Sequence, residues 1–262
     1  MSFSVTDLSF SYGRNRVLSG LSFDVPDGSL TSVLGPNGVG KTTLFRCLLG
    51  LRLGYSGTIL VNGSDVRSLS VWERAHQMAY IPQAHTNVFD YEVVDMVLMA
   101  CGTDLGMLRT PTRRHEGRAM AALERVGIDG LAHSSVNRLS GGQLQLVLVA
   151  RAIAQDARAL VLDEPTSALD FANADKVLAL ARELAGEGHS VVVSTHRPEQ
   201  AYLYSDQAIA MGSGGSIGCG TPQEVITTRN MSELYGIDVS VSSLFEDRAR
   251  ACTPSARLAK TR

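Results

Sequence analysis

Residues 35–42 read Gly35-Pro36-Asn37-Gly38-Val39-Gly40-Lys41-Thr42. This stretch fits the pattern G-x-x-x-x-G-K-[S/T] at every fixed position, and an apolar strand is expected before it at 30–34 and a helix after it at about 41–49. The glycines let backbone N–H groups converge on phosphate oxygens, and the N-terminus of the helix adds a favourable dipole. The stretch therefore predicts a loop that binds the phosphates of a nucleotide.

Three side chains at the end of this loop are candidate ligands of the nucleotide. Lys41 would reach the β- and γ-phosphates, the hydroxyl of Thr42 would ligate Mg²⁺, and Thr43 follows at the start of the helix. Of the 24 Lys and Arg residues only three are lysines, at positions 41, 176 and 260. One of these few lysines therefore stands at the position where the pattern requires lysine.

The strands around the loop indicate an α/β fold. A buried strand is expected at 30–34, and the apolar runs at 159–162 and 190–193 are typical of a parallel sheet that is covered on both faces. Short apolar bursts at 3–12 and 20–25 predict a small antiparallel sheet at the N-terminus, and helical periodicity between about 86 and 155 predicts an inserted helical lobe. We expect a nucleotide-binding core of mainly parallel sheet, with an N-terminal antiparallel β subdomain and an inserted α-helical subdomain.

The domain limits expected from this pattern are one nucleotide-binding domain at 1–245 and a basic tail at 246–262. The core would occupy about 1–85 and 156–245, and the helical subdomain about 86–155. From position 248 onward the chain has five cations and no acid, which is typical of a solvated, frayed tail or of a site for anionic lipid or RNA.

Composition narrows the class of protein. The 262 residues are 44% hydrophobic and 19% charged, which excludes wholesale disorder, and 24 basic against 26 acidic residues give no sign of a nucleic-acid partner. No run of 18 apolar residues is present, and residues 1–14 do not have the pattern of a secretory signal. The four cysteines lack metal-ligand spacing, as expected for buried or incidental thiols in a reducing compartment.

A second candidate catalytic motif is the stretch Ala159-Leu160-Val161-Leu162-Asp163-Glu164. It places two carboxylates at the carboxyl end of a buried strand, which is where α/β sheets bind ligands. Asp163 suits the coordination shell of Mg²⁺, and Glu164 suits a base that orients and polarises an attacking water. The pattern alone is weak, because many strands end in acids, but it gains weight beside the phosphate loop.

The stretch Leu139-Ser140-Gly141-Gly142-Gln143 resembles the signature of the ATP-binding-cassette (ABC) family, and the resemblance extends over nearly the whole chain. Tyr12 falls where the family has an aromatic residue that stacks on adenine. Gln83, in the run Tyr-Ile-Pro-Gln, matches the Gln loop, and residues 167–170 (Ser-Ala-Leu-Asp) match the D-loop. His196 follows an apolar strand and matches the switch histidine.

The resemblance implies an ATPase that works as a head-to-tail dimer with two ATP molecules between the protomers. Residues 140–143 would contact the γ-phosphate held by the second copy, and Asp170 is counted with them among the nucleotide-binding residues. Gln83 would sense the γ-phosphate and Mg²⁺, and His196 would donate to the oxygens of the transition state. The cofactors implied are ATP and Mg²⁺. From the residues alone, Ser140 is equally explained as an ordinary helix N-cap, and Tyr12, Gln83 and His196 as structural residues.

Two positions depart from the pattern. Leu146 stands where many members of the family have arginine, and Val39 replaces a small residue that is common inside the phosphate loop. Neither change removes a catalytic group, so we expect an active site with its chemistry intact.

Residues 196–201, His-Arg-Pro-Glu-Gln-Ala, resemble the H-x-P-x-Q-A form found in importers of iron chelates, haem, cobalamin and molybdate. This resemblance implies a motor at the cytoplasmic face of the membrane, bound to permease subunits. A substrate-binding protein would deliver the transported solute to these subunits. A soluble ABC ATPase of DNA repair or iron–sulfur assembly is the alternative. Only 55 residues separate Gln83 from Leu139, too few for the long coiled coil of the repair ATPases. A binding module without turnover is disfavoured by the presence of Glu164 and His196.

An apolar group just after Gln83 is a candidate docking surface for the permease. It consists of Val88, Phe89, Tyr91, Val93 and Val94. Packing within the helical lobe is the other explanation for these residues.

Overall fold

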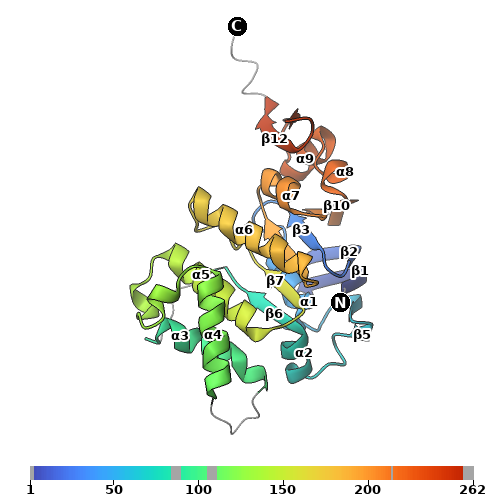
Figure 1. Ribbon diagram of the computed structural model, residues 1–262. Coiled ribbons are helices and arrows are strands. Elements are labelled where there is room, and N and C mark those ends of the chain that lie inside the picture. Colours follow the sequence, from blue (N-terminus) through green and yellow to red (C-terminus); the bar gives the residue numbers. More distant parts are fainter. Residues whose placement is uncertain (1–2, 84–89, 105–110, 214, 256–262) are drawn as a thin grey trace. The chain divides into compact units, whose positions relative to one another are not determined.

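The computed structural model describes residues 3–83, 90–104, 111–213 and 215–255 (Figure 1). The chain divides into two compact units, the first made of residues 1–68 and 182–262 and the second of residues 69–181. The expected helical insert at 86–155 lies within the second unit, together with strands that the sequence analysis assigned to the core. Each unit is described by itself.

The first unit begins with a small antiparallel sheet. Its strands are β1 (Phe3–Tyr12), β2 (Asn15–Val25), β4 (Ser56–Val61) and β5 (Ser64–Asp65), in the order β2-β1-β4-β5. Phe3 pairs with Val25 on one side and with Val61 on the other. Phe3, Val5 and Leu8 are buried, so one face of β1 packs inward, as the apolar bursts predicted.

The first unit also holds the strand that leads into the phosphate loop. β3 (Leu30–Leu34) runs parallel to β8 (Ser190–Thr195) and to β9 (Gln207–Gly212), and β10 (Gly215–Gly220) is antiparallel to β9. Every residue of β3 and β8 is buried, including polar residues such as Thr31 and Ser194, so neither strand shows the alternation of a half-exposed sheet. Helix α1 (Lys41–Leu48) follows the loop, and Gly50, with φ +65°, ends it as expected.

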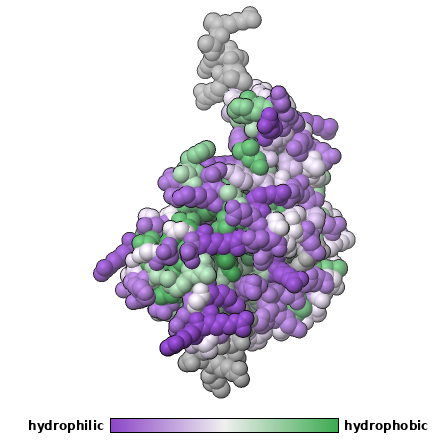
Figure 2. Space-filling view, viewed as in Figure 1, coloured by the Kyte–Doolittle hydropathy of each residue, from purple (hydrophilic) through white to green (hydrophobic). Residues whose placement is uncertain are grey.

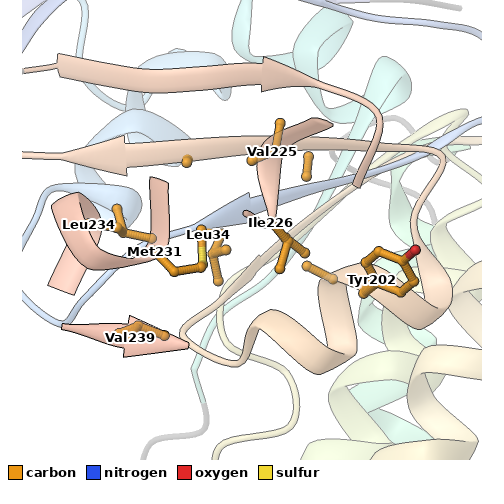
Figure 3. Close-up of a cluster of buried hydrophobic side chains, with 10 residues drawn as sticks. Leu34, Tyr202, Val225, Ile226, Met231, Leu234 and Val239 are labelled. Carbon is orange, nitrogen blue, oxygen red and sulfur yellow. The ribbon is translucent and has the colours of Figure 1, made fainter. Parts of the chain in front are cut away.

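The C-terminal part of the first unit has its own buried cluster (Figure 3). Helices α7 (Pro198–Tyr204), α8 (Pro222–Val225) and α9 (Thr228–Tyr235) supply half of its ten buried side chains. Ile226, Met231 and Leu34 are fully buried in it, and Leu34 comes from the strand before the phosphate loop. The cluster therefore joins the C-terminal helices to the sheet that carries the loop.

The expectation of a tail from residue 246 is wrong for Ala249–Pro254. These residues form β12, which pairs with β11 (Val239–Leu244) in an antiparallel hairpin. Arg250 is held by several groups of the first unit. It pairs with Asp247 over 2.9 Å, donates to the carbonyls of Gln223 and Ile226 at 2.8 Å, and lies 5.0 Å above the ring of Tyr202. A cation with this many partners is part of the fold.

The tip of this hairpin exposes apolar side chains, and Figure 2 shows hydrophobic surface in this part of the first unit. Leu244 is 42% exposed and Phe245 77% exposed.

The second unit combines two parallel strands with helices. β6 (Met78–Ile81) pairs with β7 (Ala159–Leu162), and α2 (Val71–Gln77) precedes β6. The helical part comprises α3 (Val93–Leu98), α4 (Arg113–Arg125) and α5 (Gly141–Gln155), with short 3-10 turns at Met99–Asp104, Asp129–Leu131 and Val136–Arg138. Helix α6 (Phe171–Gly186) starts in this unit and ends in the first.

The mixed α/β architecture with an antiparallel N-terminal sheet and a helical insert confirms the predicted fold class. Within the described ranges, no helix is both long and apolar enough to cross a membrane. The four cysteines are free thiols, and Cys47 and Cys101 are buried, as expected.

Candidate functional site

Lys41 is fixed inside the phosphate loop. Its side chain is only 5% exposed, and Nζ donates to the carbonyl of Gly35 over 2.8 Å and to that of Pro36 over 3.1 Å. Helix α1 begins at Lys41, and no side chain caps its N-terminus. Backbone N–H groups at such a helix start bind anions, and the positive end of the helix dipole adds to the attraction. The ammonium group and the helix start therefore place positive charge at the same end of the loop.

The glycines of the loop are required by close contacts. A Cβ atom on Gly35 would lie 2.5 Å from the carbonyl oxygen of Met211, and one on Gly40, which has φ +110°, would lie 2.8 Å from Val17. The N–H of Gly35 donates to the carbonyl of Thr195 over 3.2 Å. Val39 is partly exposed, and its Cγ1 is another near neighbour of Gly35, at 3.0 Å from that Cβ position.

Tyr12 lies beside helix α1. Side-chain hydrogen bonds with Arg52, Thr43 and Arg46 lower the pKa of its hydroxyl, and its ring packs edge-on against Phe10 with centroids 4.9 Å apart. The side chain is 43% exposed, so part of the ring is open for a stacking partner. The first unit thus brings the predicted residues Tyr12 and Thr43 together. Arg46 and Arg52 were missed by the sequence analysis, which had no signal for them.

His196 directly follows β8, as predicted. The hydroxyl of Thr195 accepts from the N–H of Arg197 over 3.0 Å and donates to Gln200 over 3.1 Å, so the turn between β8 and α7 is held internally. Tyr235 donates from its hydroxyl to the carbonyl of His196 over 2.9 Å. The side chain of His196 is exposed, which leaves it accessible to a ligand.

The two acids predicted to act on Mg²⁺ and water, Asp163 and Glu164, directly follow β7 in the second unit. Asp163 is 3% exposed, its N–H donates to Ile81, and its Oδ2 accepts from the hydroxyl of Tyr80 over 3.3 Å. Glu164 has a left-handed backbone with φ +46° and is partly exposed. A left-handed glutamate is unusual and marks a sharp turn at the strand end. Tyr80 was missed because its contact with Asp163 joins positions 83 residues apart.

Gln83 is connected to Glu164 through Ser167. The amide Nε2 of Gln83 donates to the hydroxyl of Ser167 over 3.4 Å, and this hydroxyl donates to the carbonyl of Glu164 over 3.0 Å. The sequence analysis placed Ser167 in the D-loop without assigning it a role. In the structure Ser167 connects Gln83, which was predicted to sense the γ-phosphate, with the backbone of Glu164, which was predicted to activate water.

The signature residues form a complete capping box at the start of α5. The hydroxyl of Ser140 accepts from the N–H of Gln143 over 3.2 Å, and the side chain of Gln143 accepts from the N–H of Ser140 over 2.9 Å. Ser140 is therefore a helix N-cap, which is the alternative that the residues alone left open, and the N–H groups of Gly141 and Gly142 open the helix.

The D-loop lies against these glycines. A Cβ on Gly142 would be 3.3 Å from Leu169, and one on Gly141 would be 4.0 Å from Ala168. Asp170 caps the next helix, since its carboxylate accepts from the backbone N–H and from the side-chain amide of Asn173 at 2.8 and 3.1 Å. Signature and D-loop are neighbours within one chain.

Leu146, one of the two departures from the family pattern, is a buried residue of α5. It is 9% exposed on the buried face of α5, beside a run of buried residues at 145–150. A leucine at this position packs in the core.

The predicted residues fall into two sets. The first unit holds Tyr12, residues 35–43 and His196, and the second holds Gln83, residues 140–143, Asp163, Glu164 and Asp170. Of the candidate docking surface, Val88 and Phe89 lie outside the described residues. Val93 is fully buried, as the packing explanation expected for it, and Tyr91 is 40% exposed.

Comparison with known proteins gives a consistent picture. The sequence profile of the ABC transporter family matches residues 18–167. A hemin import ATP-binding protein, HmuV, of Deinococcus radiodurans is 39% identical over 251 residues, covering 92% of each chain. A Helicobacter pylori ATP-binding protein named for iron chelatin transport is 37% identical over 249 residues, covering 94% of this chain and 97% of its own. A solved structure of an ABC transporter described as metal-chelate type, in an inward-facing conformation, matches with a TM-score of 0.85 at 32% identity over 97% of both chains.

Proposed function

Because the chain belongs to the ABC transporter family, we propose that it is the ATP-hydrolysing subunit of a membrane importer for an iron chelate, haem or a related metal-containing solute. The observation that carries the choice of substrate class is the similarity along more than nine-tenths of the chain to relatives named for hemin and iron chelatin import. The soluble ABC ATPase considered from the sequence is not favoured, because these relatives are transport proteins by name.

Residues of the first unit would hold the nucleotide. In the first unit, the start of α1 and the ammonium of Lys41 favour the phosphates, and the half-exposed ring of Tyr12 would stack on adenine. Residues 35–43 would surround the phosphate chain with backbone N–H groups.

Mg²⁺ fits the donor chemistry of the proposed ligands. Thr42, Gln83 and Asp163 offer hydroxyl, amide and carboxylate oxygens, which are the donors that Mg²⁺ prefers, and a carboxylate as buried as that of Asp163 is stabilised by a cation. When bound with the nucleotide, the ion would neutralise charge on the phosphate oxygens.

Glu164 and His196 would carry the hydrolysis. Glu164 is partly exposed at the end of β7, so its carboxylate would accept a proton from the attacking water. His196 would donate a hydrogen bond to phosphate oxygens as negative charge develops on them. Gln83, linked to the Glu164 backbone through Ser167, would adjust its position according to the presence of the γ-phosphate.

The active form would be a head-to-tail dimer. Within one chain the N–H groups of Gly141 and Gly142 open α5 and form a second anion-binding helix start, with Ser140 as its cap. In the dimer this helix start would face the γ-phosphate held by the other copy, and Gln143 and Asp170 would hold the adjoining backbone in shape.

The chain would work at the cytoplasmic face of the membrane, bound to permease subunits and supplied indirectly by a substrate-binding protein. We keep Val88, Phe89, Tyr91 and Val94 as the proposed contact with the permease. Tyr91 is exposed, which suits a contact, whereas Val93 is fully buried and is left out.

Reconstitution tests this function. The chain is assembled in proteoliposomes with candidate permease subunits from the same organism, and uptake of haem, a ferric siderophore and molybdate is measured with and without ATP. We expect ATP-dependent uptake of one of the metal-containing solutes and none with a Glu164→Gln complex. Uptake of none of them by a complex that hydrolyses ATP would contradict the substrate class.

A further inference from the structure

The carbonyl of His196 is held by a residue from the C-terminal part of the chain. Tyr235, the last residue of α9, donates from its hydroxyl to this carbonyl over 2.9 Å. Gly236, with φ +65°, ends the helix at the next position, so the place of Tyr235 is set by the helix terminus.

The neighbouring carbonyl is held from the opposite direction. The carbonyl of Thr195 accepts from the N–H of Gly35, the first glycine of the phosphate loop, over 3.2 Å. Two successive carbonyls at the end of β8 are therefore tied to two different elements of the first unit. One tie leads to the nucleotide-binding loop, and the other leads to α9.

Tyr235 is well suited to be a permanent donor. Burial raises the pKa of its hydroxyl, and Cys252 and Glu199 nearby raise it further, so the proton stays in place at physiological pH. Glu199 also accepts from the N–H of Cys252 over 3.3 Å, which connects α7 with β12 around the tyrosine. The C-terminal hairpin therefore packs beside the tyrosine that donates to the His196 carbonyl.

We propose that Tyr235 is a positioning residue for ATP hydrolysis, which fixes the backbone of His196 so that its imidazole is aimed at the phosphate. The inference rests on the proposed catalytic role of His196. A side chain on an exposed turn loses its aim when the backbone rotates, and a catalytic group must be held within a fraction of an ångström of its working position. Two anchored carbonyls restrict this rotation, and only one of the anchors lies in the nucleotide-binding loop.

The test replaces Tyr235 with phenylalanine, which keeps the ring and removes only the donor. We expect kcat for ATP hydrolysis by the full-length chain to fall about 3- to 10-fold, the loss for one hydrogen bond, while KM for ATP stays within about 2-fold. Tyr202→Phe is the matched control, since Tyr202 (Figure 3) also donates to a backbone carbonyl of the C-terminal part, that of Asp247, over 2.8 Å. The control should keep the wild-type kcat.

A spectroscopic measurement separates positioning from general destabilisation. The chain has six histidines, and His196→Ala identifies the imidazole resonance of His196 in a ¹H–¹³C NMR spectrum. Tyr235→Phe should shift or broaden this resonance, and Tyr202→Phe should not. An unchanged kcat and resonance in Tyr235→Phe, or equal losses in both tyrosine variants, would overturn the inference. Normal turnover of His196→Ala would overturn the catalytic role of the histidine itself, so the two failures are distinguishable.

Discussion

The amide of Gln83 lies 3.4 Å from the hydroxyl of Ser167, and this hydroxyl donates in turn to the carbonyl of Glu164 over 3.0 Å. The residue proposed to sense the γ-phosphate is therefore connected, through one side chain, to the backbone of the residue proposed to activate water. Glu164 holds a left-handed backbone with φ +46°, and the Ser167 bond is one of the contacts that keep this turn closed.

Ser167→Ala should lower kcat about 3- to 10-fold with little change in ATP affinity, because it removes both hydrogen bonds and leaves the phosphate loop intact. Ser68→Ala is the matched control. The Ser68 hydroxyl donates to the carbonyl three residues earlier, that of Asp65, over 2.7 Å, in the same local geometry. Stopped-flow phosphate release should show the loss in Ser167→Ala alone, and equal losses in both variants would contradict the connection.

Ser140→Ala should affect both stability and turnover. Loss of the N-cap of α5 should cost about 1 kcal/mol of unfolding free energy, and the disturbed helix start should reduce ATP turnover at least several-fold. Ser70→Ala removes an equivalent capping box at α2, where the cap hydroxyl is also 3.2 Å from the N–H three residues on. Urea unfolding should give similar losses for the two variants, while only Ser140→Ala reduces turnover. Normal turnover of Ser140→Ala would remove the signature from the proposed site.

The Asp247–Arg250 pair predicts an acid-sensitive part of the stability. The Arg250 guanidinium lowers the pKa of Asp247 to about 2, which is below its value of about 3.9 in an unfolded chain. A lowered pKa in the folded state stabilises the fold above the unfolded value, and this stabilisation is lost as the pH falls from about 4 towards 2. Asp247→Asn should therefore lower Tm at pH 7, and its difference from the wild type should shrink through that range. A difference that stays constant with pH would contradict the pairing.

ATP, but not ADP, should drive dimerisation of Glu164→Gln, because only the γ-phosphate can bridge the phosphate loop of one chain and the α5 start of the other. Light scattering should show a dimer with ATP and a monomer with ADP. Gly142→Arg, whose side chain would occupy the helix start, should stay monomeric with ATP. A chain that binds ATP and remains monomeric, alone and in the permease complex, would contradict the proposed dimer.

Local patterns predicted much of this structure because they depend on residues close together in the chain. The phosphate loop, β3 and α1 follow from the glycine spacing and from the buried strand expected at 30–34. The role of Gln143 as a capping partner was also readable, because Ser140 followed three positions later by Gln is a capping-box pattern.

Contacts between distant positions were not predictable. The charge count after position 248 suggested a tail, whereas Arg250 is held by the carbonyls of Gln223 and Ile226 and by Asp247. Tyr80 and Tyr235 gained roles only when folding brought them to Asp163 and His196. A hydrogen bond across tens of residues leaves no periodic signal in the sequence.

The claim that this chain hydrolyses ATP is tested most directly by measuring phosphate release. The measurement compares Glu164→Gln with the wild-type chain. The glutamine keeps the shape of the side chain and removes the base, so we expect ATP binding within about 2-fold of wild type and turnover lower by about 100-fold or more. Lys41→Ala serves as the second variant and should lose ATP binding itself. Near-normal turnover in Glu164→Gln, with ATP binding intact, would contradict the catalytic role of Glu164.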